Sequence, residues 1–201
     1  MPVTRVAAVL AAKRRSGGLR APRNKVSAAR LQAHESNLAD MKRAAKTLEK
    51  YDKDGSCRLQ PAEVKQLLTD MNEGTEPTVT EQSFIMKLCD DTCENGSLDL
   101  SEITEAVNAW KTYIKQKDAI TEEFVKFDSS QNGKLEKSEL KKYLMHLNDG
   151  IDVSDDEVDW VMSQGDVFGD GACTAQELVM ASAAWYTHIE EKKSSTACTL
   201  L

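Results

Sequence analysis

Long apolar runs are missing from this chain, and so are the paired cysteines and histidines of common disulfide and zinc frameworks. No stretch approaches the roughly 20 consecutive apolar residues that span a bilayer, so we expect a soluble or peripheral protein. The five cysteines, at positions 57, 89, 93, 173 and 198, have no paired spacing, and the three histidines are scattered. This usage indicates a reducing compartment and argues against zinc.

The residue groups that catalysis requires are also lacking. The sequence shows no nucleophile with a matching base and orienting group, no phosphate-cradling glycine loop, and no metal site with nitrogen or sulfur ligands. We therefore expect a protein that is not an enzyme and takes no small-molecule substrate.

Acidic residues are absent from the first 34 positions, which carry eight basic ones. Because the whole chain has a net charge of −7, the remainder carries −15. Such an acidic body disfavours nucleic acid and suits cations. Three interpretations of the basic arm stay open: a disordered tail, a mitochondrial transit peptide, or a segment for a membrane surface or an acidic partner. We expect a cytoplasmic protein, which would be peripheral to a membrane if the arm binds a membrane surface. The alternative is a mitochondrial protein, if the arm is a transit peptide.

What the chain does contain is a run of oxygen-bearing side chains from Asp128 to Glu139. A hard cation such as Ca²⁺ takes six to eight oxygen ligands, and this run offers them at alternating positions around a glycine, Gly133. The expected ligands are Asp128, Ser130, Asn132, the Lys134 carbonyl, Glu136 through water, and a bidentate Glu139.

The same pattern recurs at residues 52–63, 91–102 and 166–177, so the four starts are separated by 39, 37 and 38 residues. We call these stretches loops one to four in chain order. The pattern resembles the EF-hand superfamily, in its four-handed calmodulin and troponin C form. The resemblance covers roughly residues 40 to 190 and implies Ca²⁺ as the cofactor.

A second similarity relates hands two and four, which share Glu, Ala, Trp, Thr and Ile at an offset of 75 residues. The repeating unit is therefore a pair of hands. We expect an all-α fold of two EF-hand pairs, at 35–115 and 116–190, joined by a helical connector and with short antiparallel β pairing between loops. The basic arm (1–34) and a flexible tail (191–201) flank them.

The resemblance also implies ligands in the other three loops, with one departure in each. Cys57 replaces the glycine of loop one, Cys93 stands at the third ligand of loop two, and Phe168 stands at the third ligand of loop four. We expect loops one and three to bind calcium, loop two to bind weakly, and loop four to bind weakly or not at all. The implied ligands are Asp52, Asp54, Ser56, Arg58 and Glu63 in loop one, Asp91, Asn95, Ser97 and Glu102 in loop two, and Asp166, Asp170, Ala172 and Glu177 in loop four.

The last four residues, Cys198 to Leu201, match the prenylation box C-a-a-X. Lipidation of Cys198, helped by the basic arm, would bring the protein to a membrane, and the alternative is an unmodified terminus.

Unequal ligand sets in paired hands favour a calcium sensor that changes shape and grips an amphipathic helix of a target protein. The alternative is a calcium buffer, or a constitutive light-chain-like subunit whose hands do not open.

Overall fold

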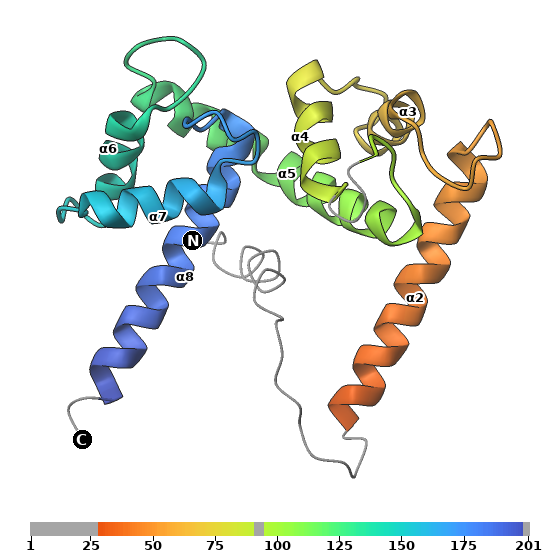
Figure 1. Cartoon of the computed structure of the whole chain (residues 1–201), viewed down its shortest axis with the longest axis horizontal. Coiled ribbons are helices and arrows are strands. Elements are labelled where there is room, and N and C mark those ends of the chain that lie inside the picture. Colours follow the sequence, from red (N-terminus) through yellow and green to blue (C-terminus); the bar gives the residue numbers. More distant parts are fainter. Residues whose placement is uncertain (1–27, 91–94, 199–201) are drawn as a thin grey trace. The chain divides into compact units, whose positions relative to one another are not determined.

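The computed structural model describes the backbone of residues 28–90 and 95–198, and the side chains of 35–90 and 95–192. The fold is all-α, as predicted, with seven helices in the described residues (Figure 1). None of these helices combines the length and the apolar character needed to cross a membrane. The helices are α2 (Ala28–Tyr51), α3 (Pro61–Met71), α4 (Val79–Cys89), α5 (Leu100–Phe127), α6 (Lys137–Leu147), α7 (Asp155–Gly165) and α8 (Ala175–Cys198).

The chain divides into two compact units between Ile114 and Lys115. One unit holds α2, α3, α4 and the first part of α5, and the other holds the rest of α5 with α6, α7 and α8. The predicted helical connector is therefore α5 itself, an unbroken helix of 28 residues. No glycine or proline lies between Gly96 and Gly133 to interrupt it.

Capping boxes mark where two of the helices begin. Thr78 accepts the amide N–H of Glu81 at the start of α4, and Ser154 accepts that of Glu157 at the start of α7. The box at Ser154 is also visible in the sequence, as Ser154-Asp-Asp-Glu157. Burial would raise the pKa of Glu157, but hydrogen bonds from Lys192, Ser154 and His188 outweigh it and lower that pKa to about 2.

The loops of each unit pair through one antiparallel β-bridge, which confirms the predicted pairing. Leu59 and Leu98 exchange both backbone hydrogen bonds, at 2.8 and 2.9 Å. Leu135 and Cys173 do the same in the other unit, at 2.7 and 2.9 Å. All four side chains are fully buried, so each bridge joins the two loops to the core beneath them.

Each unit is packed around a tryptophan eight residues past the closing Glu of its second hand. Trp110 is fully buried and its indole N–H donates to the Leu68 carbonyl at 2.9 Å. Trp185 is buried in the matching place, but its indole N–H has no hydrogen-bond partner among the described residues. The two tryptophans thus occupy equivalent positions in their cores but differ in the hydrogen bonding of the indole N–H.

The C-terminal segment differs from the expectation of a flexible tail from residue 191, because α8 continues to Cys198. An ion pair between Lys192 and Glu157 ties this extension to the start of α7. The segment Glu190-Glu-Lys-Lys193 also consists of good helix formers.

Candidate metal sites

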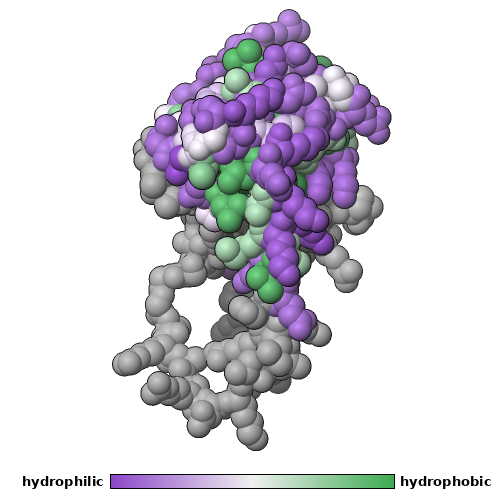
Figure 2. Space-filling model, turned by 90° about the vertical axis from the view of Figure 1, so that its right-hand side faces the viewer, coloured by the Kyte–Doolittle hydropathy of each residue, from purple (hydrophilic) through white to green (hydrophobic). Residues whose placement is uncertain are grey.

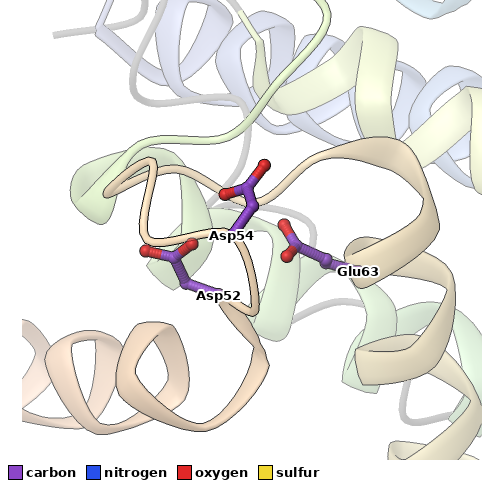
Figure 3. Close-up of side chains that lie close together, drawn as sticks. All are labelled: Asp52, Asp54 and Glu63. Atoms are coloured by element: carbon purple, nitrogen blue, oxygen red, sulfur yellow. The ribbon is translucent and has the colours of Figure 1, made fainter.

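Loop one brings three carboxylates together. Oxygen atoms of Asp52, Asp54 and Glu63 all lie within 4.8 Å of one another. Figure 3 shows that they come from the end of α2, from the loop, and from the start of α3. Two ligands of one Ca²⁺ ion lie at most about 5 Å apart, since each is 2.3–2.6 Å from the ion. The donor set of loop one therefore fits calcium.

The rest of loop one is arranged around the same point. The Ser56 hydroxyl, a predicted ligand, donates to the Arg58 carbonyl, another predicted ligand, at 3.0 Å. Hydrogen bonds from Ser56 hold the pKa of Asp54 below its usual value, so this carboxyl is ionised at neutral pH. Cys57 has φ = 60°, which shows that a side chain occupies the left-handed position where the pattern has glycine.

Loop three gathers its predicted ligands in a similar way. The Asp128 carboxylate accepts the Ser130 hydroxyl at 3.2 Å and the amide N–H groups of Asn132 and Gly133 at 3.2 and 3.0 Å. The side-chain oxygen of Asn132 accepts the amide N–H of Lys134 at 2.8 Å. These oxygen donors suit a hard cation, and Gly133 has the positive φ, 79°, that the turn requires.

The closing Glu links the two halves of its loop in both of these hands. One oxygen of Glu63 accepts the amide N–H of Lys53 at 2.7 Å, and the other accepts that of Gln60 at 2.9 Å. Glu139 makes the corresponding bonds to Ser130 and Glu136, at 2.9 and 3.1 Å. Each closing Glu lies in the first turn of its exit helix. The carboxylate that would close each loop is thus carried by the start of α3 or α6.

In loop two Asp90, one residue before the predicted first ligand, makes bonds like those of a first loop residue. In loops one, three and four, the first Asp donates its amide N–H to the carbonyl four residues back and accepts the amide N–H of the loop's sixth residue. Asp90 donates to the Met86 carbonyl at 2.9 Å and accepts the amide N–H of Gly96, the seventh residue counted from it, at 2.6 Å. The predicted first ligand Asp91, and Cys93, lie outside the described residues.

With Asp90 as the first residue, the four loops start at 52, 90, 128 and 166, an even spacing of 38 residues. Loop two then has thirteen residues and the other three have twelve. Sequence reasoning missed Asp90 because it matched the twelve-residue template backwards from Glu102. The uneven steps of 39 and 37 were the signal that could have revealed the extra residue.

The predicted ligands Asn95, Ser97 and Glu102 do lie close together in loop two. Oxygen atoms of all three are hydrogen bonded to the side chain of Arg58, which reaches across from loop one. In this arrangement the Arg58 side chain lies among three of the oxygen atoms that were predicted as ligands.

Loop four is closed by bonds within the protein. The fully buried Glu177 carboxylate accepts the amide N–H groups of Val167 and Phe168, both at 2.8 Å, and the amide and hydroxyl of Thr174 at 2.9 and 2.8 Å. Phe168 contributes only its backbone, as the sequence indicated.

Another predicted ligand of loop four makes a contact that reduces its suitability for an ion. One Asp170 oxygen pairs with the Lys134 ammonium at 2.5 Å, while the other accepts the amide N–H of Ala172 at 3.2 Å, as Asn132 accepts that of Lys134 in loop three. Asp166 accepts amide N–H groups of its own loop, as Asp128 does, so these bonds do not distinguish the two loops.

Cys173 and Cys198 complete the set of residues that the sequence singled out. Cys173 is fully buried, and this burial raises the pKa of its thiol, so it packs as a small apolar residue where Leu or Ile is usual. Cys198 is the last residue of α8, and its side chain and residues 199–201 lie outside the described part of the chain.

Two comparisons relate the chain to known proteins. Residues 117–180 match the family model described as an EF-hand domain pair. Among solved structures, a similar chain is a homolog of programmed cell death 6 protein from Leishmania major Friedlin, with 19% identity and a TM-score of 0.30. The match covers 70% of this chain and 74% of that one.

Proposed function

With residues 117–180 an EF-hand pair, the chain is a member of the EF-hand superfamily and calcium is its ion, and we propose that it acts as a calcium sensor. The proposed ion sites are loop one and loop three. The observation that carries the proposal is the position of Glu63 and Glu139 in the first turn of an exit helix, where Glu63 belongs to the carboxylate cluster of loop one and Glu139 is bonded to both halves of loop three.

A bound calcium ion would supply a concentrated positive charge for the oxygen atoms of these loops. Glu63 and Glu139 are the ligands contributed from beyond the loop's sharp turn, so their positions set the direction in which α3 and α6 leave. In sensor hands this coupling converts ion binding into a change of interhelical angle.

Apolar side chains on the hand helices would form the surface that such a change exposes. The internal methionines 71, 86, 145, 162 and 180 are all half-buried, at the edge of their cores. Flexible thioether side chains suit a groove that must accept different apolar partners. The partner we propose is an amphipathic helix of a target protein.

Part of this apolar surface is already accessible. Leu38 is 47% exposed and Met41 is 56% exposed, both on the upstream part of the long helix α2. Figure 2 shows hydrophobic residues gathered between hydrophilic ones on one face of the molecule. These residues support the proposal that the upstream part of α2 offers a contact surface in addition to capping hand one.

The proposal is tested by calcium-dependent exposure of apolar surface. Fluorescence of an environment-sensitive dye, or retention on a hydrophobic column, should increase when calcium is added to the full chain. The double variant Glu63→Gln/Glu139→Gln is the matched control and should show no increase. Absence of any calcium-dependent exposure in the natural protein would refute the sensor proposal.

One observation favours a buffer or a constitutive subunit as the second candidate. The closing Glu of every hand is buried and already bonded to backbone N–H groups of its own loop. Hands whose closing Glu is held inward have less distance to move on binding an ion. Calorimetric titration combined with small-angle scattering separates the two candidates, because a buffer binds tightly with little change in shape.

A further inference from the structure

The guanidinium group of Arg58 lies among the oxygen atoms that loop two would offer to an ion. Its Nη2 is 3.1 Å from Asn95 Oδ1, 3.0 Å from the Ser97 carbonyl oxygen and 3.4 Å from Glu102 Oε2. Its Nε donates to the Ser97 hydroxyl at 2.7 Å. Arg58 itself is the seventh residue of loop one, so its side chain crosses from one loop of the pair to the other.

The three oxygens are the ones a calcium ion would need. Counted back from the closing Glu102, Asn95 and Ser97 stand where the fifth and seventh residues stand in the other loops. Calcium requires oxygens at 2.3–2.6 Å. A nitrogen atom within 3.4 Å of all three occupies the same space, so the guanidinium and an ion exclude each other.

Charge and burial favour the guanidinium in this position. The Glu102 side chain is 2% exposed and that of Arg58 is 27% exposed, so most water is excluded from the pair. A positive partner stabilises a buried carboxylate, and arginine stays charged and presents donors in a planar fork. The antiparallel β-bridge between Leu59 and Leu98 holds the two loops side by side, and the side chain of Arg58 reaches Ser97 across it. This tether gives the guanidinium an effective concentration of the order of millimolar or higher.

The other unit contains a weaker form of the same arrangement. Lys134, the seventh residue of loop three, pairs with Asp170, the fifth residue of loop four, at 2.5 Å. The Lys134 side chain is 44% exposed, and an ammonium group lacks the fork of arginine. A basic residue at the seventh position of the first loop thus reaches into the second loop in both units.

We infer that Arg58 is the built-in cation of loop two, which holds hand two in its folded arrangement without calcium and keeps the ion out. The hand then serves as a fixed support for hand one. This inference goes beyond the sensor proposal and does not depend on it, because it concerns which loop takes an ion and not what the ion causes.

The test is the number of calcium ions bound per chain, measured by equilibrium dialysis on the full-length protein. Arg58→Gln removes the guanidinium and keeps the backbone carbonyl that loop one offers. We expect this variant to bind one more calcium ion than the natural protein, and the double variant Arg58→Gln/Glu102→Gln to lose the gained ion. Lys53→Gln is the matched control: it removes one positive charge from an exposed side chain of loop one and should leave the number unchanged.

A second measurement covers the case in which Arg58→Gln fails to fold. Glu102→Gln in the natural background should leave the number of bound ions unchanged, whereas loss of one ion would show that loop two already binds calcium and would overturn the inference. In chelator, Arg58→Gln should melt at a lower temperature than Lys53→Gln, and saturating calcium should restore most of the difference. An unchanged ion count in folded Arg58→Gln would also overturn it, since the guanidinium would then not be what excludes the ion.

Discussion

Replacement of Glu139 by Gln is the most direct test of the assignment of loop three. The Glu139 side chain is buried, and its two oxygens contact the amide N–H groups of Ser130 and Glu136, on opposite sides of the loop. Glutamine keeps the size of the side chain and one carbonyl oxygen. It removes the negative charge and one of the two oxygen ligands.

The expected loss of affinity follows from that difference. Removing one partner from a buried, oppositely charged pair costs about 3–5 kcal/mol. Because the glutamine oxygen still reaches the ion, we take the lower end of this range, about 3 kcal/mol. This loss of binding free energy corresponds to a dissociation constant that is roughly 100-fold higher.

The measurement is a competition titration against a fluorescent calcium chelator, carried out in a Glu63→Gln background. In that background loop three is the remaining proposed site, so the titration reports on it alone. Glu139→Gln should abolish tight binding there, with the helical circular dichroism signal retained as evidence of folding.

Glu177→Gln in the same background is the matched control, because Glu177 closes a loop that we expect not to hold an ion tightly. The affinity of loop three should change by less than about threefold, while the free energy of unfolding falls by about 1–3 kcal/mol, because a buried carboxylate with four protein donors is replaced. If Glu139→Gln left calcium binding unchanged, or if Glu177→Gln weakened it equally, the assignment of loop three would be wrong.

Three further predictions concern stability. In chemical denaturation, Cys57→Gly should have a free energy of unfolding about 0.5–1 kcal/mol higher than Cys57→Ala, because the relief of strain at φ = 60° exceeds the entropy cost of glycine. Equal stability of the two variants would contradict the strain argument. Gly165→Ala should destabilise the C-terminal unit by about 1–3 kcal/mol, because the added Cβ would lie 2.9 Å from the Cβ of Ala181. In a thermal melt, the second substitution Ala181→Gly should restore part of this loss. A Gly165→Ala variant as stable as the natural protein would refute the close contact. Glu157→Gln should lower the free energy of unfolding by about 1–2 kcal/mol at neutral pH, because the ionised form of Glu157 stabilises the folded state above its unfolded pKa. The difference in stability between the natural protein and the variant should shrink as the pH falls from 4.5 towards 2. If acid denaturation showed a constant difference across this range, the charge would not be responsible.

Much of the fold could be predicted because its signals are local. The spacing of oxygen-bearing residues located loops one and three, and the stretch without glycine or proline between Gly96 and Gly133 is consistent with the predicted helical connector, which is α5. The capping box at Ser154 was likewise visible as a short motif. In each case the residues that decide the structure are neighbours in the chain, so a template or a period is sufficient.

The position of Asp90 and the extent of α8 were not recovered, for two different reasons. A template of fixed length has no place for the thirteenth residue of loop two, although Asp90 makes bonds like those of a first loop residue. The continuation of α8 beyond residue 190 is accompanied by an ion pair between Lys192 and Glu157, which are 35 residues apart in the chain.

The sequence by itself thus located the loops and their order along the chain, because the pattern of each loop lies within one short segment. Only the tertiary structure decided which charges meet between loops. The loop pattern assigns Arg58 to loop one as a residue whose backbone carbonyl is a predicted ligand. Its neighbours in the sequence do not indicate that its side chain enters loop two. The antiparallel bridge at Leu59 and Leu98 brings residues 39 positions apart into contact, and that contact assigns the guanidinium to Asn95, Ser97 and Glu102.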